Sequence, residues 1–170
     1  MLLFLVAFAT TLDCNDSNIN LKTLRMQYYQ AVNNSEQTDL LLELLQSRND
    51  NNPLTKAYIG SLVALKAKHN LNPFKKLEYL KQAETIMEEA VSLAPQDIEI
   101  RFLRFSYQYY VPRFLGFSNH LQQDKEVIIN GLANHNYNSC DYKLVENVAR
   151  FLTASGECSD VELDILSKIN

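Results

Sequence analysis

Arginine and aromatic side chains gather in one short stretch of the chain. Arg101 and Arg104 lie three residues apart, Phe102 and Tyr109 stand among them, and Arg113 follows soon after. A guanidinium group is a rigid donor that can hold a carboxylate or a phosphate through two hydrogen bonds. The stretch therefore has the residue types needed to bind an anionic group, although the pattern favours arginines that pair with acidic residues of the protein itself.

Two structural pairings are expected for these arginines. Asp97 lies four residues before Arg101, a spacing that brings the two side chains together on one face of a helix. Arg104 has no acidic residue at a favourable local spacing. It is expected to meet Glu88, Glu89 or Glu99, on the same or the preceding helix, or to lie in solvent.

No other constellation in the sequence indicates catalysis. The three histidines, His69, His120 and His135, are isolated from one another, and none stands in a zinc-binding motif. The glycine-rich motifs of nucleotide-binding sites and the G-x-S-x-G motif of serine hydrolases do not occur. The sequence therefore predicts no catalytic residue, no metal site and no cofactor.

The segment from Val111 to His120 is unusually apolar for a loop. Phe114, Leu115 and Phe117 would all be costly to expose, because burying one such side chain contributes roughly 1.5–3 kcal/mol. Either the loop folds back onto the helices, which we expect, or it forms a contact patch for a partner or a membrane. Gly116 would permit the sharp reversal that both alternatives need.

The elements that position these residues are predicted to be helices. The chain has 170 residues, of which 46% are hydrophobic and 21% charged, and only four Gly and four Pro. These values are typical of one globular domain with few tight turns. The net charge of −4 argues against binding to nucleic acid through bulk charge, so no nucleic-acid partner is predicted.

Apolar residues recur at helical spacing along most of the chain. Asn52-Pro53 and Asn72-Pro73 each place a capping side chain before a proline at the first helical position. The pattern predicts an all-α fold of about eight helices stacked as antiparallel hairpins, near residues 21–33, 34–45, 53–69, 73–94, 98–110, 119–133 and 141–154, with a short eighth helix after a capping box at Ser159 and Glu162.

The first residues suggest a location for the protein. Residues 1–12 form an apolar run that is too short to span a bilayer, and Ala7-Phe8-Ala9 has the small-x-small pattern of a signal-peptidase site. The run is interpreted as an export signal or as an apolar N-terminal helix, followed by a linker over 13–20 and a single domain over 21–170. We expect an extracytoplasmic location, in the periplasm or envelope, with a cytoplasmic location as the alternative.

Ala83, Met87, Ala90 and Pro95 have the spacing of the second helix of a tetratricopeptide repeat, which this region resembles. Residues 97–116 also resemble a segment of small uncharacterised bacterial envelope proteins. The first resemblance implies a non-catalytic scaffold or adaptor that binds a protein or peptide on the first helix of each pair. The partner-binding residues expected on that surface are Tyr58, Ser61, Arg101, Phe102, Arg104, Tyr109, Arg113 and Phe114.

Two other functions are consistent with the sequence. The protein could attach to a membrane surface through its N-terminus and the loop 111–120. It could instead be a small helical ligand carrier or enzyme, in which Arg104, Tyr107 and His120 would line an enclosed pocket.

Overall fold

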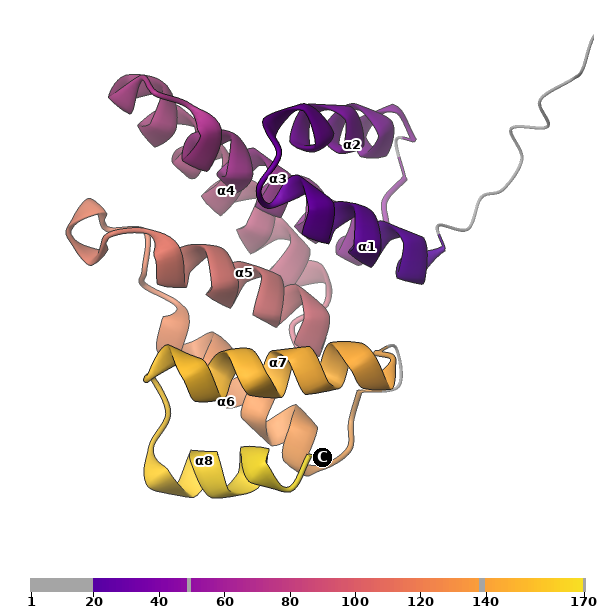
Figure 1. Cartoon of the computed structure of the whole chain (residues 1–170), viewed down its shortest axis with the longest axis vertical. Coiled ribbons are helices and arrows are strands. Elements are labelled where there is room, and N and C mark those ends of the chain that lie inside the picture. Colours follow the sequence, from indigo (N-terminus) through magenta and orange to yellow (C-terminus); the bar gives the residue numbers. More distant parts are fainter. Residues whose placement is uncertain (1–19, 49, 138–139, 170) are drawn as a thin grey trace, which may run out of the picture.

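The computed structural model describes residues 20–48, 50–137 and 140–169. This part of the chain is all-α: it contains eight helices and no strand (Figure 1). The predicted fold class and helix number are therefore confirmed.

The predicted export signal at 1–12 lies outside the described residues, as does all of the predicted linker except Asn20. The helices are α1 (Leu21–Ala31), α2 (Ser35–Ser47), α3 (Pro53–His69), α4 (Pro73–Leu93), α5 (Ile98–Tyr110), α6 (Leu121–Ala133), α7 (Tyr142–Ser155) and α8 (Asp160–Ser167), with a short 3₁₀ helix, η1 (Arg113–Leu115).

The helix starts follow the capping residues of the sequence. The Asn52 side chain accepts hydrogen bonds from the backbone N–H groups of Leu54 and Thr55, at 2.8 and 3.3 Å. Asn72 caps α4 in the same way, and Ser159 and Glu162 form the predicted capping box. These side chains satisfy backbone donors that a helix start leaves without a partner.

The first and sixth helices are shorter than predicted. The first helix ends at Ala31, because Asn34 caps α2 and the residues between form the turn. The sixth helix begins at Leu121, and the backbone N–H of His120 donates to the side chain of Gln108, at 3.1 Å.

The first six helices stack as three hairpins (Figure 1). α1 packs on α2, α3 on α4 and α5 on α6, and both helices of one hairpin contact the first helix of the next. The final pair departs from this order, because α8 packs on both α6 and α7.

Small residues allow α3 and α4 to pack closely. A Cβ atom added to Gly60 would lie 3.0 Å from Cγ of Met87. Ala83 and Ala90 of α4 are completely buried. Because a larger side chain at these positions would separate the two helices, the spacing of small residues determines how tightly this hairpin closes.

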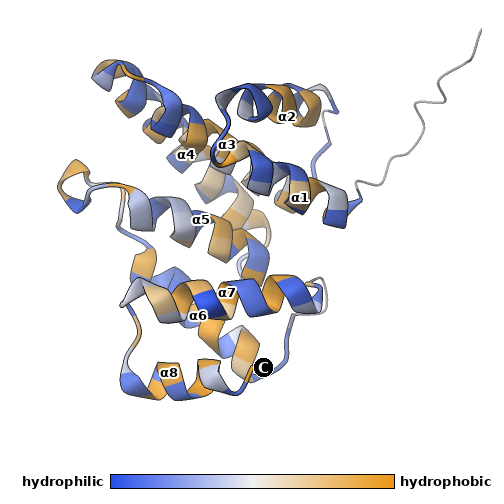
Figure 2. Cartoon of the chain, in the orientation of Figure 1, coloured by the Kyte–Doolittle hydropathy of each residue, from blue (hydrophilic) through white to orange (hydrophobic). Residues whose placement is uncertain are grey.

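α5 lies between two apolar clusters. Ile100 and Leu103 belong to a cluster built mainly by α1 to α4, whereas Ile98 and Phe105 belong to a second cluster with α6, α7 and α8. Figure 2 colours the chain by hydropathy, and orange, hydrophobic segments occur along α5 and along the helices that pack on it. α5 therefore joins the two halves of the described structure.

The apolar loop after α5 folds back in part, as predicted. Phe117 is buried against Ala67 and Leu80, and Leu115 packs beside them. Gly116 makes the reversal with φ of 81°, in the left-handed region. Phe114, by contrast, is 87% exposed, so one aromatic ring of the loop is buried and the other lies in solvent.

Candidate interaction surface

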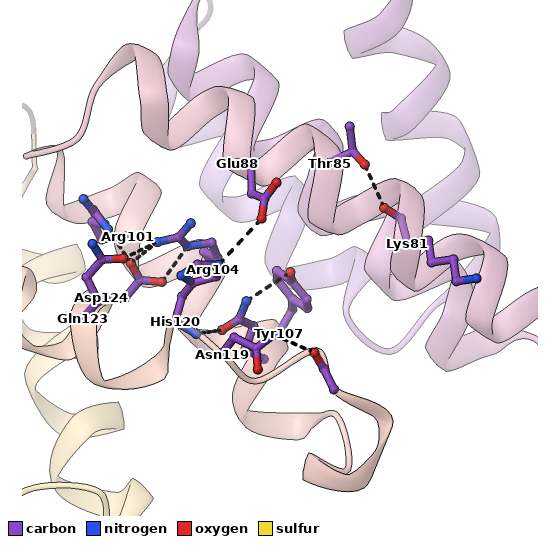
Figure 3. A network of polar contacts seen from close by, with 12 residues as sticks. Lys81, Thr85, Glu88, Arg101, Arg104, Tyr107, Asn119, His120, Gln123 and Asp124 are labelled. Carbon is purple, nitrogen blue, oxygen red and sulfur yellow. Dashed lines mark hydrogen bonds and ion pairs between the residues drawn. The ribbon is translucent and has the colours of Figure 1, made fainter.

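Arg101 and Arg104 share one buried carboxylate, that of Asp124 in α6 (Figure 3). Arg101 Nη1 lies 2.8 Å from Asp124 Oδ1, and Arg104 donates through Nε and Nη2 to the two oxygens of Asp124, at 2.7 Å each. All three side chains are at most 5% exposed. The arginine cluster therefore serves to join α5 to α6.

The predicted local partners of these arginines were wrong. The Asp97 carboxylate accepts the backbone N–H of Ile100 and caps α5, whereas Arg101 pairs with Asp124. Arg104 pairs with Asp124 in place of the expected Glu88, Glu89 or Glu99. Which residues pair depends on where α5 and α6 cross. The spacing of residues within one helix gives no information about that crossing.

A second acidic group borders this network. Glu88 of α4 lies 3.6 Å from Nε2 of His120, at the start of α6 (Figure 3). Burial, and then the neighbouring Glu88 carboxylate, raise the pKa of Glu84 above its usual value, while His120 opposes the shift. These groups sit at the surface between α4 and α6 and link the second hairpin to the third.

Glu99 forms a second buried polar network. Its side chain is 1% exposed and accepts hydrogen bonds from Tyr58 and Arg25. Burial, followed by the Glu99 charge, raises the pKa of Tyr58. This network could not be predicted from the sequence, because nothing in the local pattern around Glu99 distinguishes it from a solvent-facing glutamate.

Four of the predicted partner-binding residues lie inside the helix packing. Tyr58 and Ser61 are 2% and 1% exposed, in the cluster of the first hairpins, and Arg101 and Arg104 are bound to Asp124. These four side chains are buried in the helix packing, so they contribute no surface area to a partner in this conformation.

Phe102 and Tyr109 lie elsewhere, in an aromatic layer between α5 and α7. The Phe102 and Phe151 rings meet edge to face at 5.4 Å, and Tyr109 meets Phe151 in the same way at 5.6 Å. Tyr110 adds a third edge contact to Phe151 at 6.0 Å while remaining 74% exposed. We call Phe102, Tyr109, Tyr110 and Phe151 the aromatic surface.

Arg113 and Phe114, the last predicted residues, lie in η1 beyond the aromatic surface. Arg113 pairs with Glu157 in the turn between α7 and α8, and this contact ties η1 to the last hairpin. Phe114 has almost its whole side chain in solvent.

A second exposed apolar group was not predicted. It lies at the turn between α3 and α4, where Leu71 is 97% exposed, Phe74 82% and Leu77 36%. Five lysines occur between residues 66 and 81. The signal in the sequence that could have indicated this group is the concentration of lysine beside these apolar residues.

The concave features of the described residues are modest. A depression of about 200 Å³, open to solvent, lies between α2, α3 and α4. Thr38, Asp39, Lys66, His69 and Tyr79 are among its lining residues. Arg104, Tyr107 and His120, which were considered for an enclosed pocket, do not line it.

No family model, curated protein or solved structure matches this chain. Within the described residues, no group of three or more His, Cys, Asp or Glu side chains is arranged to hold a metal ion. Among the described helices, none has both the length and the apolar character needed to cross a bilayer.

Proposed function

We propose that this chain is a non-catalytic scaffold or adaptor that binds a protein or peptide segment on the aromatic surface of α5 and α7. The observation that supports this function is Tyr110, whose ring is 74% exposed although it rests against Tyr109 and Phe151. Exposed aromatic rings with fixed neighbours are favourable contact residues, because they bury a large area at a small cost in conformational entropy.

The packing around this surface supports the same function. Tyr109 donates a hydrogen bond to the backbone carbonyl of Ser155, at 3.2 Å, and so fixes its ring between α5 and α7. The pairing of Arg101 and Arg104 with Asp124 fixes α5 against α6. A partner would therefore meet a preorganised surface and would not have to order it on binding.

The resemblance to tetratricopeptide repeats contributes the class of function, since stacked helix hairpins are widely used to bind peptides. The resemblance of residues 97–116 to small envelope proteins contributes the location, outside the bacterial cytoplasm. Fractionation of the native host tests this location. Recovery only from the cytosol, with Met1 retained, would contradict it.

Photo-crosslinking in the native host tests the binding surface directly. A photoreactive amino acid replaces Tyr110 in one variant and Tyr142, which is 66% exposed at the first turn of α7, in the control. We expect a discrete adduct from position 110 and none of that mass from position 142. Because an exposed aromatic anchor typically contributes about 2 kcal/mol or more, Tyr110→Ala should lower the affinity for the crosslinked partner at least tenfold.

Two results would contradict the proposal. One is the absence of any adduct from position 110 in a well-expressed variant. The other is the same set of adducts from both positions, which would indicate random encounters. Tyr142→Ala serves as the matched control in the affinity measurement and should leave the affinity unchanged.

A further inference from the structure

We infer that the α3–α4 turn and η1 form one edge of the molecule that docks on a membrane surface containing anionic lipids. We call this edge, defined by Leu71, Phe74, Leu77, Phe114 and the lysines of 66–81, the basic apolar edge. It is separate from the aromatic surface proposed to bind a protein, and it concerns a different kind of partner.

The first observation is the exposure of its apolar side chains. Leu71, Phe74 and Phe114 are 97%, 82% and 87% exposed, the three highest values among the large exposed hydrophobic residues of the described structure. Each lies at a turn or within the first turn of a helix, where its side chain extends away from the body of the protein. Isolated protruding apolar residues of this kind suit insertion into the interface of a bilayer better than a flat protein contact.

The second observation is charge. Residues 66–81 contain five lysines and one glutamate, a net charge of +4, in a chain whose total is −4. The rest of the chain is accordingly acidic, with a net charge of −8, so the positive charge of the protein is concentrated beside its most exposed apolar residues. Lysines in this position can extend their aliphatic stems along the interface and place their ammonium groups among lipid phosphates.

Three of these lysines, Lys68, Lys76 and Lys81, have no acidic partner within the described residues. Lys76 and Lys81 make no ion pair there, whereas Lys75 pairs with Glu78 at 2.8 Å and Lys66 pairs with Asp39. Lys68 donates to the backbone carbonyl of Val32. Lys76 and Lys81 are therefore the lysines best able to interact with lipid headgroups.

The two parts of the edge are held together by packing. Phe117 and Leu115, which follow Phe114, pack on Ala67 of α3 and Leu80 of α4. In Figure 1 the α3–α4 turn and the connection after α5 extend from the same side of the molecule. Both parts can therefore meet one flat surface at the same time, and the energies of their contacts add.

Vesicle flotation of the full chain tests the inference. Phosphatidylcholine vesicles with phosphatidylglycerol are compared with vesicles of phosphatidylcholine alone, at low and high salt. We expect binding to the anionic vesicles, weakened by salt. Lys76→Gln and Lys81→Gln should each lower the partition coefficient about fivefold, since a lysine near an anionic surface contributes about 1 kcal/mol. Leu71→Ser combined with Phe74→Ser should lower it at least tenfold.

A tryptophan probe tests the position of the edge in the bilayer. The chain contains no tryptophan, so Phe74→Trp and Phe114→Trp each introduce a single fluorophore. Brominated lipids should quench both, while Tyr142→Trp, the control at the first turn of α7, should be unaffected. Val161→Ser, which replaces another exposed apolar residue, should leave vesicle binding unchanged.

Three outcomes would overturn the inference. The first is equal binding of the wild type and the Leu71→Ser/Phe74→Ser variant. Both proteins have the same residues 1–19, so equal binding would mean that the basic apolar edge does not contribute to it. The second is quenching at position 142 equal to that at 74. The third is loss of binding in the lysine variants but not in the serine variants, which would make the edge a site for soluble polyanions rather than for a membrane.

Discussion

Arg25 and Glu99 stand 74 positions apart in the chain and form an ion pair through two hydrogen bonds. Arg25 Nη2 lies 2.6 Å from Glu99 Oε2, and Arg25 Nε lies 2.8 Å from Glu99 Oε1. The Tyr58 hydroxyl donates to the same Oε1 at 2.6 Å, and Arg25 also reaches Asp141, the cap of α7, at 2.9 Å. One buried carboxylate thus connects α1, α3 and α5, and its arginine extends the connection to α7.

Replacing Glu99 with glutamine should therefore destabilise the protein. The substitution keeps the shape of the side chain but removes the charge opposite Arg25, and breaking a buried pair is costly because one charge is left without its partner. Since Arg25 retains Asp141 and is 15% exposed, we expect a loss of about 2–3 kcal/mol in the free energy of unfolding, below the range for a fully buried pair. Urea unfolding gives this value. The exposed Glu146→Gln serves as the control, and an equal effect of both substitutions would show that the network contributes little.

Removing Asp124 should have a larger effect. Asp124→Ala leaves two arginines, each at most 5% exposed, without their shared carboxylate, and we expect a loss of about 3–5 kcal/mol. Asp164→Ala removes an exposed carboxylate paired with Lys168 and should change stability by less than about 0.5 kcal/mol. If Asp124→Ala unfolds at the wild-type urea concentration, the cluster does not have the structural role assigned to it.

The helices could be predicted from the sequence because their start signals are local. Asn52 and Asn72 each precede a proline, and the structure begins α3 and α4 at those prolines. A capping side chain and a proline ring act within three or four residues of themselves, so their effect can be recognised without knowing the fold.

The buried ion pairs could not be predicted in the same way. The helical spacing suggested that Asp97 would pair with Arg101, but Asp97 caps α5, and the partner of Arg101 lies 23 residues further along, in α6. That pairing depends on where α5 and α6 cross, which tertiary packing decides. For the same reason, sequence alone could not separate Phe117, which is buried, from Phe114, which is exposed.

The buried tyrosines should make the protein unstable at alkaline pH. Burial raises the pKa of Tyr107 from 10.0 to about 12, and raises that of Tyr58 as well. Between these values the unfolded chain releases the tyrosine protons while the folded chain retains them, so ionisation favours unfolding. The stabilising contribution is complete below pH 10 and is lost as the pH rises through 12.

Urea unfolding at a series of pH values measures this loss, and tyrosinate absorbance follows the ionisation. The free energy of unfolding should fall steadily above pH 10. Tyr107→Phe removes one of the groups and should make the fall shallower. If the free energy of unfolding does not change up to pH 12, these hydroxyls ionise at the same pH in the folded and the unfolded protein.

Gly60 should tolerate one methyl group and no more. In Gly60→Ala the new Cβ lies 3.0 Å from Cγ of Met87, a flexible side chain, and the gain in helix propensity of about 1 kcal/mol offsets the adjustment. Gly60→Leu must push α4 away from α3, and we expect it to cost at least about 2 kcal/mol. Thermal unfolding of both variants checks the prediction. Equal melting temperatures would contradict the close packing of this hairpin.

Phe114 and Phe117 provide a matched pair within one loop. Phe117 is 6% exposed and packs against Ala67 and Leu80, so Phe117→Ala should lower the free energy of unfolding by about 3 kcal/mol. Phe114 is 87% exposed, and Phe114→Ala should change stability by less than about 0.5 kcal/mol. Vesicle binding should show a different pattern, because Phe114→Ala removes an apolar contact of the basic apolar edge from a protein that is still fully folded. If Phe114→Ala has the stability of the wild type but binds anionic vesicles less tightly, Phe114 contributes to membrane binding and Phe117 to folding. A large loss of stability in Phe114→Ala would instead mean that this ring packs on the protein itself.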